Sequence, residues 1–177
     1  MRVYWARNQA EKLVRELIHR REIEPPTIDP IKVAKALDLS VVIDDLGPEV
    51  SGLLIRRGKR VVIAVERTDP PSRRNFTVAH EVGHHVLGHQ FEAGSHVHVD
   101  KGNYISQRGP RSSQGIDAKE VEANQFAAAL LMPTWLVQEQ ARRLGLPLWD
   151  SDVTELADQF KVSEQAMTIR LSALRLL

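Results

Sequence analysis

Two histidines and a glutamate at helical spacing carry the clearest chemistry in this chain. His80 and His84 lie four positions apart in the segment HEVGH, and Glu81 directly follows the first histidine. Residues four apart share one face of an α-helix, so both imidazoles can bind one metal ion with Glu81 beside them. Zinc suits such ligands, and a hydrolytic zinc site has three protein ligands and an open position for water. The motif therefore predicts a zinc centre in which Glu81 accepts the proton of a bound water.

A third ligand has to come from another part of the chain. His85 and His89 are near in sequence, but His85 points about 100° round the helix from His84. The extended pattern HExxHxxGxxH is absent, because Leu87 and Gln90 occupy its glycine and histidine positions. Neither neighbouring histidine is therefore well placed as a ligand.

The segment EVEAN at residues 120–124 is the better source of the third ligand. A carboxylate followed four residues later by asparagine supplies a ligand and a side chain that can orient a ligating histidine. Glu120 and Asn124 have that spacing. Glu122 is the competing ligand, but it lies about 100° or more from the other two on a helix, and we expect it to face solvent or a basic neighbour. Helical geometry favours Glu120 as the third ligand, and Glu122 remains the alternative.

Composition limits the other possibilities. The chain has 177 residues and no cysteine, so a metal has to be bound by histidine, aspartate or glutamate. The formal net charge of +1 provides no global field that attracts nucleic acid or a membrane surface. No apolar run approaches a membrane span and the N-terminal residues do not resemble a signal peptide, so we expect a cytoplasmic protein without membrane contact.

Apolar spacing predicts the elements that position these residues. We expect helices over residues 6–18, 30–37, 72–88 and 117–132, capped in the last three cases by Asp29, Ser72 and Asp117, and a broken helical pair over residues 152–174 recapped by Ser163. We expect a small antiparallel sheet from strands at residues 40–43, 52–56 and 60–65, with a further short strand at residues 96–99. The domains would be residues 1–135, with the metal centre, and a helical subdomain of residues 136–177.

Two features of the site stay open at this point. Hydrolysis at such a zinc centre produces an oxyanion, which a hydrogen-bond donor or a positive charge has to stabilise. Six side chains are chemically able to do so: Tyr104, Arg108, His85, His89, His96 and His98. The segment HVHVD at residues 96–100 is either an edge strand that binds an extended substrate by strand addition or a plain surface hairpin.

The two motifs are similar to those of a known family. The segments RRNFTVAHEVGHHVLGH and EVEANQFAAALLMP, in this order and spacing, resemble the ImmA/IrrE family of metallopeptidases, and the resemblance extends over most of residues 6–135. It implies an α+β fold with a thermolysin-like HExxH helix and a second metal-ligand helix. It also implies that His80, His84 and Glu120 bind Zn²⁺ and that Glu81 is the general base.

The resemblance also implies a function. Such a zinc endopeptidase cuts a partner protein, typically a helix-turn-helix transcriptional repressor, in stress response or in mobile-element or toxin–antitoxin control. The alternative is a non-catalytic, zinc-containing regulatory or antitoxin-like protein that contacts DNA, and binding of that kind would require Arg170.

The C-terminal segment LADQFKVSEQAMTIRLSALRLL has the apolar spacing of a helix-turn-helix unit. DNA binding needs clustered cations. From residue 152 onward the charges sum to −1, from Asp152, Glu155, Asp158 and Glu164 against Lys161, Arg170 and Arg175. We therefore interpret the segment as packing or substrate-recognition helices and expect no direct binding of nucleic acid.

Overall fold

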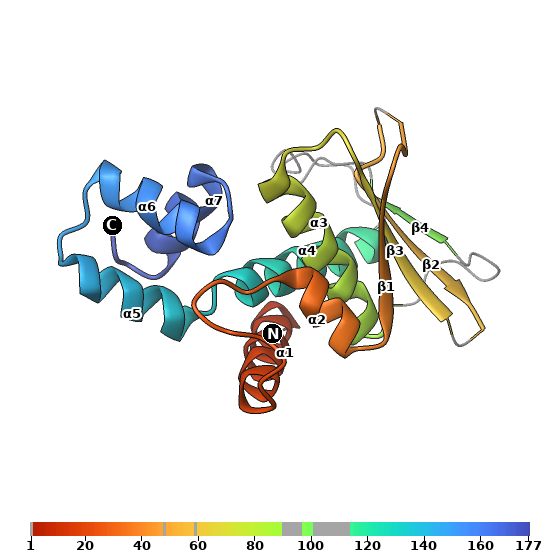
Figure 1. The fold of residues 1–177 in the computed structure, drawn as a ribbon, viewed down its shortest axis with the longest axis horizontal. Coiled ribbons are helices and arrows are strands. Elements are labelled where there is room, and N and C mark those ends of the chain that lie inside the picture. Colours follow the sequence, from red (N-terminus) through yellow and green to blue (C-terminus); the bar gives the residue numbers. More distant parts are fainter. Residues whose placement is uncertain (1, 48, 59, 90–96, 101–113) are drawn as a thin grey trace.

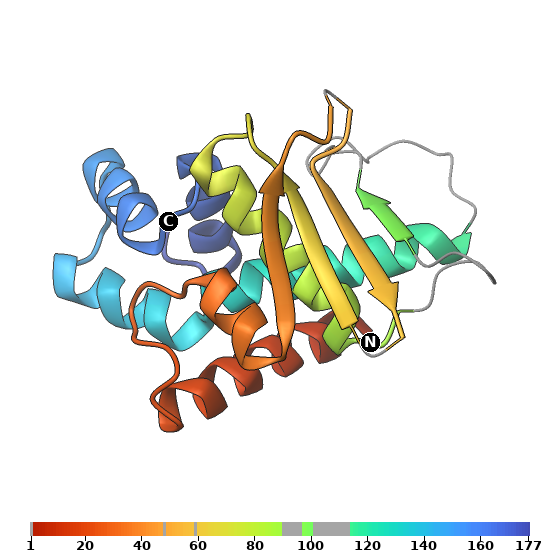
Figure 2. The same cartoon turned by 45° about the vertical axis from the view of Figure 1, so that its right-hand side comes forward.

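The computed structural model describes residues 2–47, 49–58, 60–89, 97–100 and 114–177. Its architecture is α+β, with a four-stranded sheet on one side of the molecule and helices behind it (Figures 1 and 2). The strand order is β1-β3-β2-β4, and the strands are β1 (Leu39–Asp44), β2 (Gly52–Arg57), β3 (Arg60–Glu66) and β4 (Val97–Asp100).

The sheet is mixed, so the prediction of a purely antiparallel sheet is wrong. Strands β2 and β3 form the predicted antiparallel hairpin, and β4 pairs antiparallel with the other edge of β2. Strand β1, however, pairs parallel with β3, which separates β1 from β2. The connection from β1 to β2 crosses the end of β3, where Glu66 accepts a hydrogen bond from Leu46 N at 2.7 Å and Glu66 N donates to Ser51 O at 3.0 Å.

The helices agree largely with the sequence patterns. They are α1 (Arg2–His19), α2 (Pro30–Ala36), α3 (Pro71–Val86), α4 (Gln114–Leu131), α5 (Thr134–Leu144), α6 (Asp150–Phe160) and α7 (Glu164–Ala173). The predicted N-caps Asp29 and Ser163 are confirmed, because each side chain accepts hydrogen bonds from the first turn of its helix.

Two predicted helix starts are wrong. Helix α3 begins at Pro71, whose missing N–H and restricted φ suit the first helical position, so Ser72 lies inside the first turn instead of capping it. Helix α4 begins at Gln114, three residues before Asp117. In both cases the chain enters the helix earlier than the first good capping side chain.

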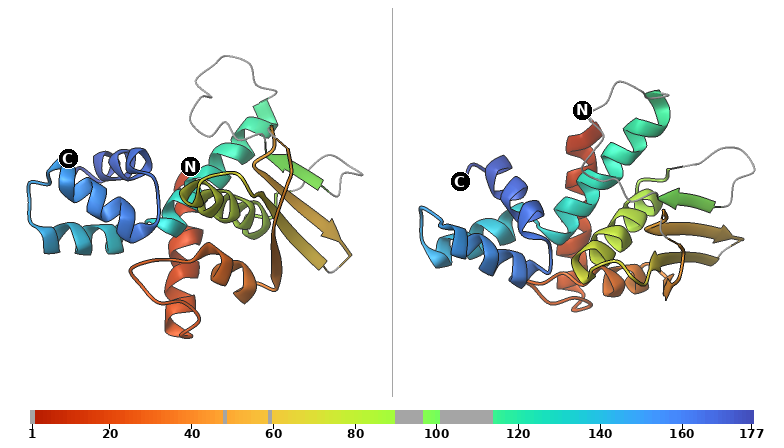
Figure 3. Two further views of the ribbon diagram at one scale, coloured as in Figure 1. Left: turned by 45° about the horizontal axis from the view of Figure 1, so that its top comes forward. Right: turned by 90° about the horizontal axis from the view of Figure 1, so that it is seen from above.

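The helices form successive layers behind the sheet. Helix α3 packs on β2, β3 and α2, and α4 lies between α3 and α1 (Figure 3). The run FAAALLM in α4 is almost entirely buried because helices cover it on more than one side. None of the helices in the described residues combines the length and the hydropathy that a membrane span requires.

Helices α5 to α7 lie at the opposite end of the molecule from the sheet (Figure 1). Long-range hydrogen bonds attach them to the rest, among them Thr27 Oγ1 to Gln159 O at 2.6 Å, Asn75 Nδ2 to Lys161 O at 3.2 Å, Thr134 N to Glu11 Oε1 at 2.9 Å and Arg170 Nε to Met132 O at 2.9 Å. Arg170 is only 6% exposed. Its guanidinium is therefore part of the interior that joins α7 to the end of α4.

Candidate metal centre

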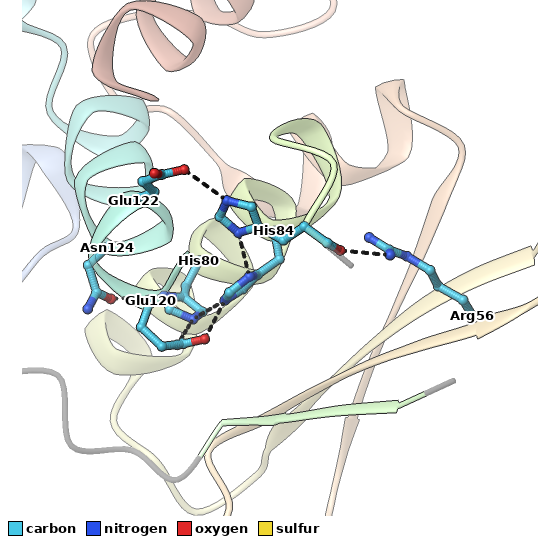
Figure 4. A network of polar contacts seen from close by, with 7 residues as sticks. Arg56, His80, His84, Glu120, Glu122 and Asn124 are labelled. Atoms are coloured by element: carbon cyan, nitrogen blue, oxygen red, sulfur yellow. Dashed lines mark hydrogen bonds and ion pairs between the residues drawn. The ribbon is translucent and has the colours of Figure 1, made fainter. Parts of the chain in front are cut away.

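Two imidazoles from α3 and one carboxylate from α4 converge on a single point (Figure 4). The Nε2 atoms of His80 and His84 lie 2.9 Å apart. The carboxylate of Glu120 lies 3.2 Å from His80 Nε2 through Oε2 and 3.3 Å from His84 Nε2 through Oε1. Both histidines are fully buried, while Glu120 is partly exposed. The structure thus brings together the three residues that the sequence proposed as ligands.

A close helix contact makes this convergence possible. A β-carbon at Gly83 would lie 3.1 Å from Phe126 Cδ1 and 3.3 Å from Ala123 O, both in α4. Only a residue without a side chain allows α3 and α4 to approach to this distance without displacing the phenyl ring. The glycine within the HEVGH motif therefore sets the distance at which Glu120 meets the two imidazoles.

The donor atoms fit a zinc ion. Asn124 Oδ1 lies 2.9 Å from His80 Nδ1, and since the amide oxygen only accepts, this nitrogen carries the proton and Nε2 presents its lone pair. Two imidazole nitrogens and a carboxylate that face one point are the donor set that zinc binds in proteins. Donors about 2.0–2.1 Å from a tetrahedral zinc ion lie about 3.3 Å apart, close to the separations seen here.

Glu81 lies on the same helix and is fully buried. A β-carbon at Gly52, the first residue of β2, would lie 3.4 Å from Glu81 Oε1 and would overlap with Thr77 Cγ2. The Glu81 carboxylate therefore lies against the start of β2, where the absence of a side chain leaves space for it. Gly52 is in turn paired with Asp100 at the end of β4.

Comparison with known proteins agrees with this geometry. Residues 34–172 match the IrrE N-terminal-like domain, Peptidase_M78. The chain belongs to this family. The match confirms the resemblance that the two sequence motifs indicated, and the matched residues include both motifs.

Two proteins related to this chain have informative names. The chain is 24% identical over 127 residues to "Uncharacterized immunity region protein 2" of Bacillus phage phi105, covering 72% of this chain and 73% of that protein. It is 32% identical over 111 residues to "Radiation response metalloprotease IrrE" of Deinococcus radiodurans. This second match covers 63% of the chain but only 30% of the Deinococcus protein, which is much longer.

A solved structure of a Mycobacterium tuberculosis transcriptional regulator has a similar fold. The TM-score is 0.58 at 18% sequence identity, over 97% of this chain and 52% of that one. At this identity the likeness concerns the fold, and it extends to the C-terminal helices.

Behind His84 lies a second pair of buried polar residues. His89 Nδ1 lies 2.9 Å from His84 Nδ1, and His89 Nε2 lies 3.2 Å from Glu122 Oε2. Glu122 is 4% exposed, so the expectation that it faces solvent is wrong, whereas the alternative of a basic neighbour is correct, with Arg2 Nη1 at 3.9 Å. Desolvation by burial is the main cause that lowers the pKa of His89, and the neighbouring Glu122 carboxylate opposes it.

The sequence contained a signal for the position of His89. Gly88 has a φ of +68°, and the helix end that such a glycine forms folds the next residue back over the residue five positions earlier. That pair is His89 and His84. The sequence predicts a helix that ends near Gly88, but His89 stands in that prediction as a candidate metal ligand or oxyanion donor and not as a residue that supports a ligand.

Of the other candidates for the oxyanion donor, the structure describes the side chain of His85. His85 is half-buried, and desolvation and the nearby charge of Arg56 both lower its pKa, so it is neutral at pH 7. Tyr104, Arg108 and His96, together with the side chain of His98, lie outside the described residues.

Proposed function

We propose that this chain is a zinc-dependent endopeptidase in which His80, His84 and Glu120 bind the metal and Glu81 is the general base. The observation that supports this most directly is the convergence of two imidazole nitrogens and one carboxylate on a single buried point. Membership of the family and the 32% identity to a protein named as a metalloprotease agree with it.

The number of ligands favours a catalytic role over a structural one. A structural zinc site is normally closed by four protein ligands, whereas a hydrolytic site has three and an open position. In the part of the chain that the structure describes, the cluster consists of three ligand residues. His89 and Glu122, the nearest further candidates, pair with His84 and with each other instead.

Bound zinc lowers the pKa of a water molecule and polarises the carbonyl of the scissile bond. The Glu81 carboxylate would accept the proton of that water and later donate it to the leaving amine. Burial of Glu81 between α3 and β2 keeps its carboxylate in one orientation and limits access of bulk water. His80 and His84 would hold the reacting centre next to it.

Strand β4 is a suitable site for an extended peptide. It is the last strand in the order of the described sheet, so a substrate can add to its outer edge by main-chain hydrogen bonds. Asp100 at the end of β4 is paired with Gly52, which lies against Glu81. A peptide bound along this edge would lie about 10 Å, two strand spacings, from Gly52, and its side chains or a turn in it would have to span this distance to the general base.

The substrate we propose is a DNA-binding repressor of the helix-turn-helix type, cut in stress response or in mobile-element control. The support is the family resemblance together with the names of the two relatives, an immunity region protein and a radiation response metalloprotease. Cleavage of such a repressor would take place in the cytoplasm.

The test is incubation of the zinc-loaded protein with the repressor encoded beside it, with the fragments identified by mass spectrometry. We expect defined fragments from the wild type and about 10²- to 10⁴-fold slower cleavage by Glu81→Gln, which removes the base. Zinc content is measured in both proteins as the control, because the amide variant should retain the metal. Cleavage by Glu81→Gln at the wild-type rate would disprove the mechanism.

The alternative of a non-catalytic protein that contacts DNA loses its main support. Arg170, which that alternative requires, is buried and donates to Met132 O and Thr134 Oγ1. The exposed residues of α7 include no cation: Glu164, Gln165, Thr168, Ile169, Ser172 and Ala173. Stoichiometric binding of the intact repressor without any cleavage would nevertheless favour a regulatory protein over a peptidase.

A further inference from the structure

We propose that His89 and Glu122 are positioning residues that orient His84 and determine which of its ring nitrogens carries the proton. This role rests on the proposed metal centre, because only a histidine that binds a metal has to present a lone pair to it. The arrangement itself is a property of the folded chain.

The end of α3 places His89 against His84. His89 N donates to His84 O at 3.0 Å and Gly88 N donates to His85 O at 3.2 Å, the two hydrogen bonds of a Schellman motif. This motif usually brings two apolar side chains together, but here it joins two imidazoles whose ring centroids are 5.0 Å apart. Arg56 Nη1 in β2 donates to His89 O at 3.0 Å, a hydrogen bond that connects the end of α3 to the sheet (Figure 4).

The order of the protons follows from the carboxylate. Glu122 Oε2 lies 3.2 Å from His89 Nε2, and a carboxylate oxygen accepts in such a contact, so the ring nitrogen is the donor and carries a proton. The Nδ1 atoms of His89 and His84 lie 2.9 Å apart, and His84 is the donor in this contact because its Nε2 faces the proposed ligands His80 and Glu120 and has to keep a lone pair for the metal. The proton of His84 is thus on Nδ1, and its Nε2 presents a lone pair toward His80 and Glu120.

The two histidines of the centre are supported differently. His80 Nδ1 contacts an amide oxygen, Asn124 Oδ1, in α4. His84 is oriented by two residues, one from the end of α3 and one from α4. His89 and Glu122 are 5% and 4% exposed, and burying such groups is unfavourable unless each is paired. Glu122 contacts His89, and His89 contacts the imidazole of the proposed ligand His84. Residues that hydrogen-bond to metal ligands are commonly arranged in this way around bound metals.

The first test uses substitutions at His89 and measures zinc affinity. His89→Leu removes the acceptor at similar volume, and we expect zinc affinity to fall about 10- to 100-fold. His89→Asn places an amide oxygen near the position of the ring Nδ1, as Asn124 does for His80, and should recover most of the affinity. His85→Leu is the matched control, because the same change at a neighbouring histidine outside the chain of contacts should leave zinc affinity unchanged.

Two outcomes of this test would overturn the proposal. One is His89→Leu binding zinc as tightly as the wild type. The other is His89→Asn binding as weakly as His89→Leu, since that result would mean that the ring matters for packing and not as an acceptor.

The second test needs neither a variant nor zinc. Nitrogen-15 NMR of the histidine rings in metal-free wild-type protein should show neutral His89 protonated on Nε2. Protonation on Nδ1 would reverse the order of the protons and overturn the proposal. If the wild type does not bind zinc at all, the proposed function fails while this measurement still decides the arrangement of His89.

Discussion

The α3–α4 interface and the C-terminal helices α5 to α7 have interiors of different character. Between α3 and α4 the buried residues include five with ionisable side chains: His80, Glu81, His84, His89 and Glu122. In α5 to α7 the interior is apolar apart from Gln140 and Arg170. Apolar burial alone is sufficient to hold three helices together at about 25 cal/mol per Å². Burying five ionisable side chains at one interface is costly unless each is partnered, so this polar interior indicates a function.

Arg170, the buried arginine of the C-terminal helices, is a polar residue whose contacts join parts of the fold. Arg170 donates to a backbone carbonyl and a threonine hydroxyl, and it lies 3.7 Å from the Glu11 carboxylate in α1. These partners come from segments that α7 has to be joined to. The partners of His84, in contrast, form a line that ends at the metal-facing side of the ring.

Removing the third ligand should have the largest effect on metal binding. We expect Glu120→Ala to weaken zinc binding by more than about 100-fold, beyond the effect of changing a supporting residue. The unfolding free energy of the metal-free protein should change by less than about 1 kcal/mol, because the side chain is partly exposed and faces two imidazoles. Isothermal titration calorimetry and urea unfolding measure the two quantities. Retention of full zinc affinity would exclude Glu120 as a ligand.

A larger residue in place of Gly83 should lower both the stability of the protein and its affinity for zinc. Gly83→Val inserts a side chain against Phe126 and Ala123, and overpacking of this kind is expected to lower stability by about 2–3 kcal/mol. Zinc affinity should fall as well, since α3 and α4 carry different ligands. Urea unfolding and zinc titration of the same preparation test this. A stable protein with normal zinc affinity would show that the helix spacing is not limiting.

In the C-terminal helices we expect a substitution to lower stability without changing zinc affinity, the reverse of the result expected for Glu120→Ala. Arg170→Met should destabilise the metal-free protein by about 1–2 kcal/mol, because Met132 O and Thr134 Oγ1 lose a buried donor, and leave zinc affinity unchanged. Arg175→Met, a change at an exposed arginine of the same segment, should alter stability by less than about 0.5 kcal/mol. A loss of zinc affinity in Arg170→Met would mean that the two regions are coupled.

The smallest effect is expected at a carboxylate that serves only the fold. Hydrogen bonds from Thr68 N, Thr68 Oγ1 and Leu46 N lower the pKa of Glu66 from 4.5 to about 2. A depressed pKa in the folded state stabilises the protein above pH 4.5, and this contribution is lost as the pH falls toward 2. The metal-free wild type should therefore exceed Glu66→Gln in stability most at pH 6–7, with the difference shrinking in acid. A pH-independent difference in urea unfolding would contradict this.

Much of the site could be predicted because its central residues are close in sequence. The shared face of His80 and His84 follows from helical geometry, and the spacing of Glu120 and Asn124 singled out a ligand with its support. The end of the helix at Gly88 was also foreseen, and the contact of His89 with His84 is a local consequence of that end. The caps at Asp29 and Ser163 were found for the same reason.

The sequence by itself determined which residues lie on one face of a helix, because the rise and turn of a helix are the same in every protein. Only the tertiary structure decided the parallel pairing of β1 with β3, the burial of Glu122 beside His89 and Arg2, and the burial of Arg170 beneath α7. Each of these depends on which distant segments pack together. Packing is set by the summed contacts of whole elements, and no local spacing records it.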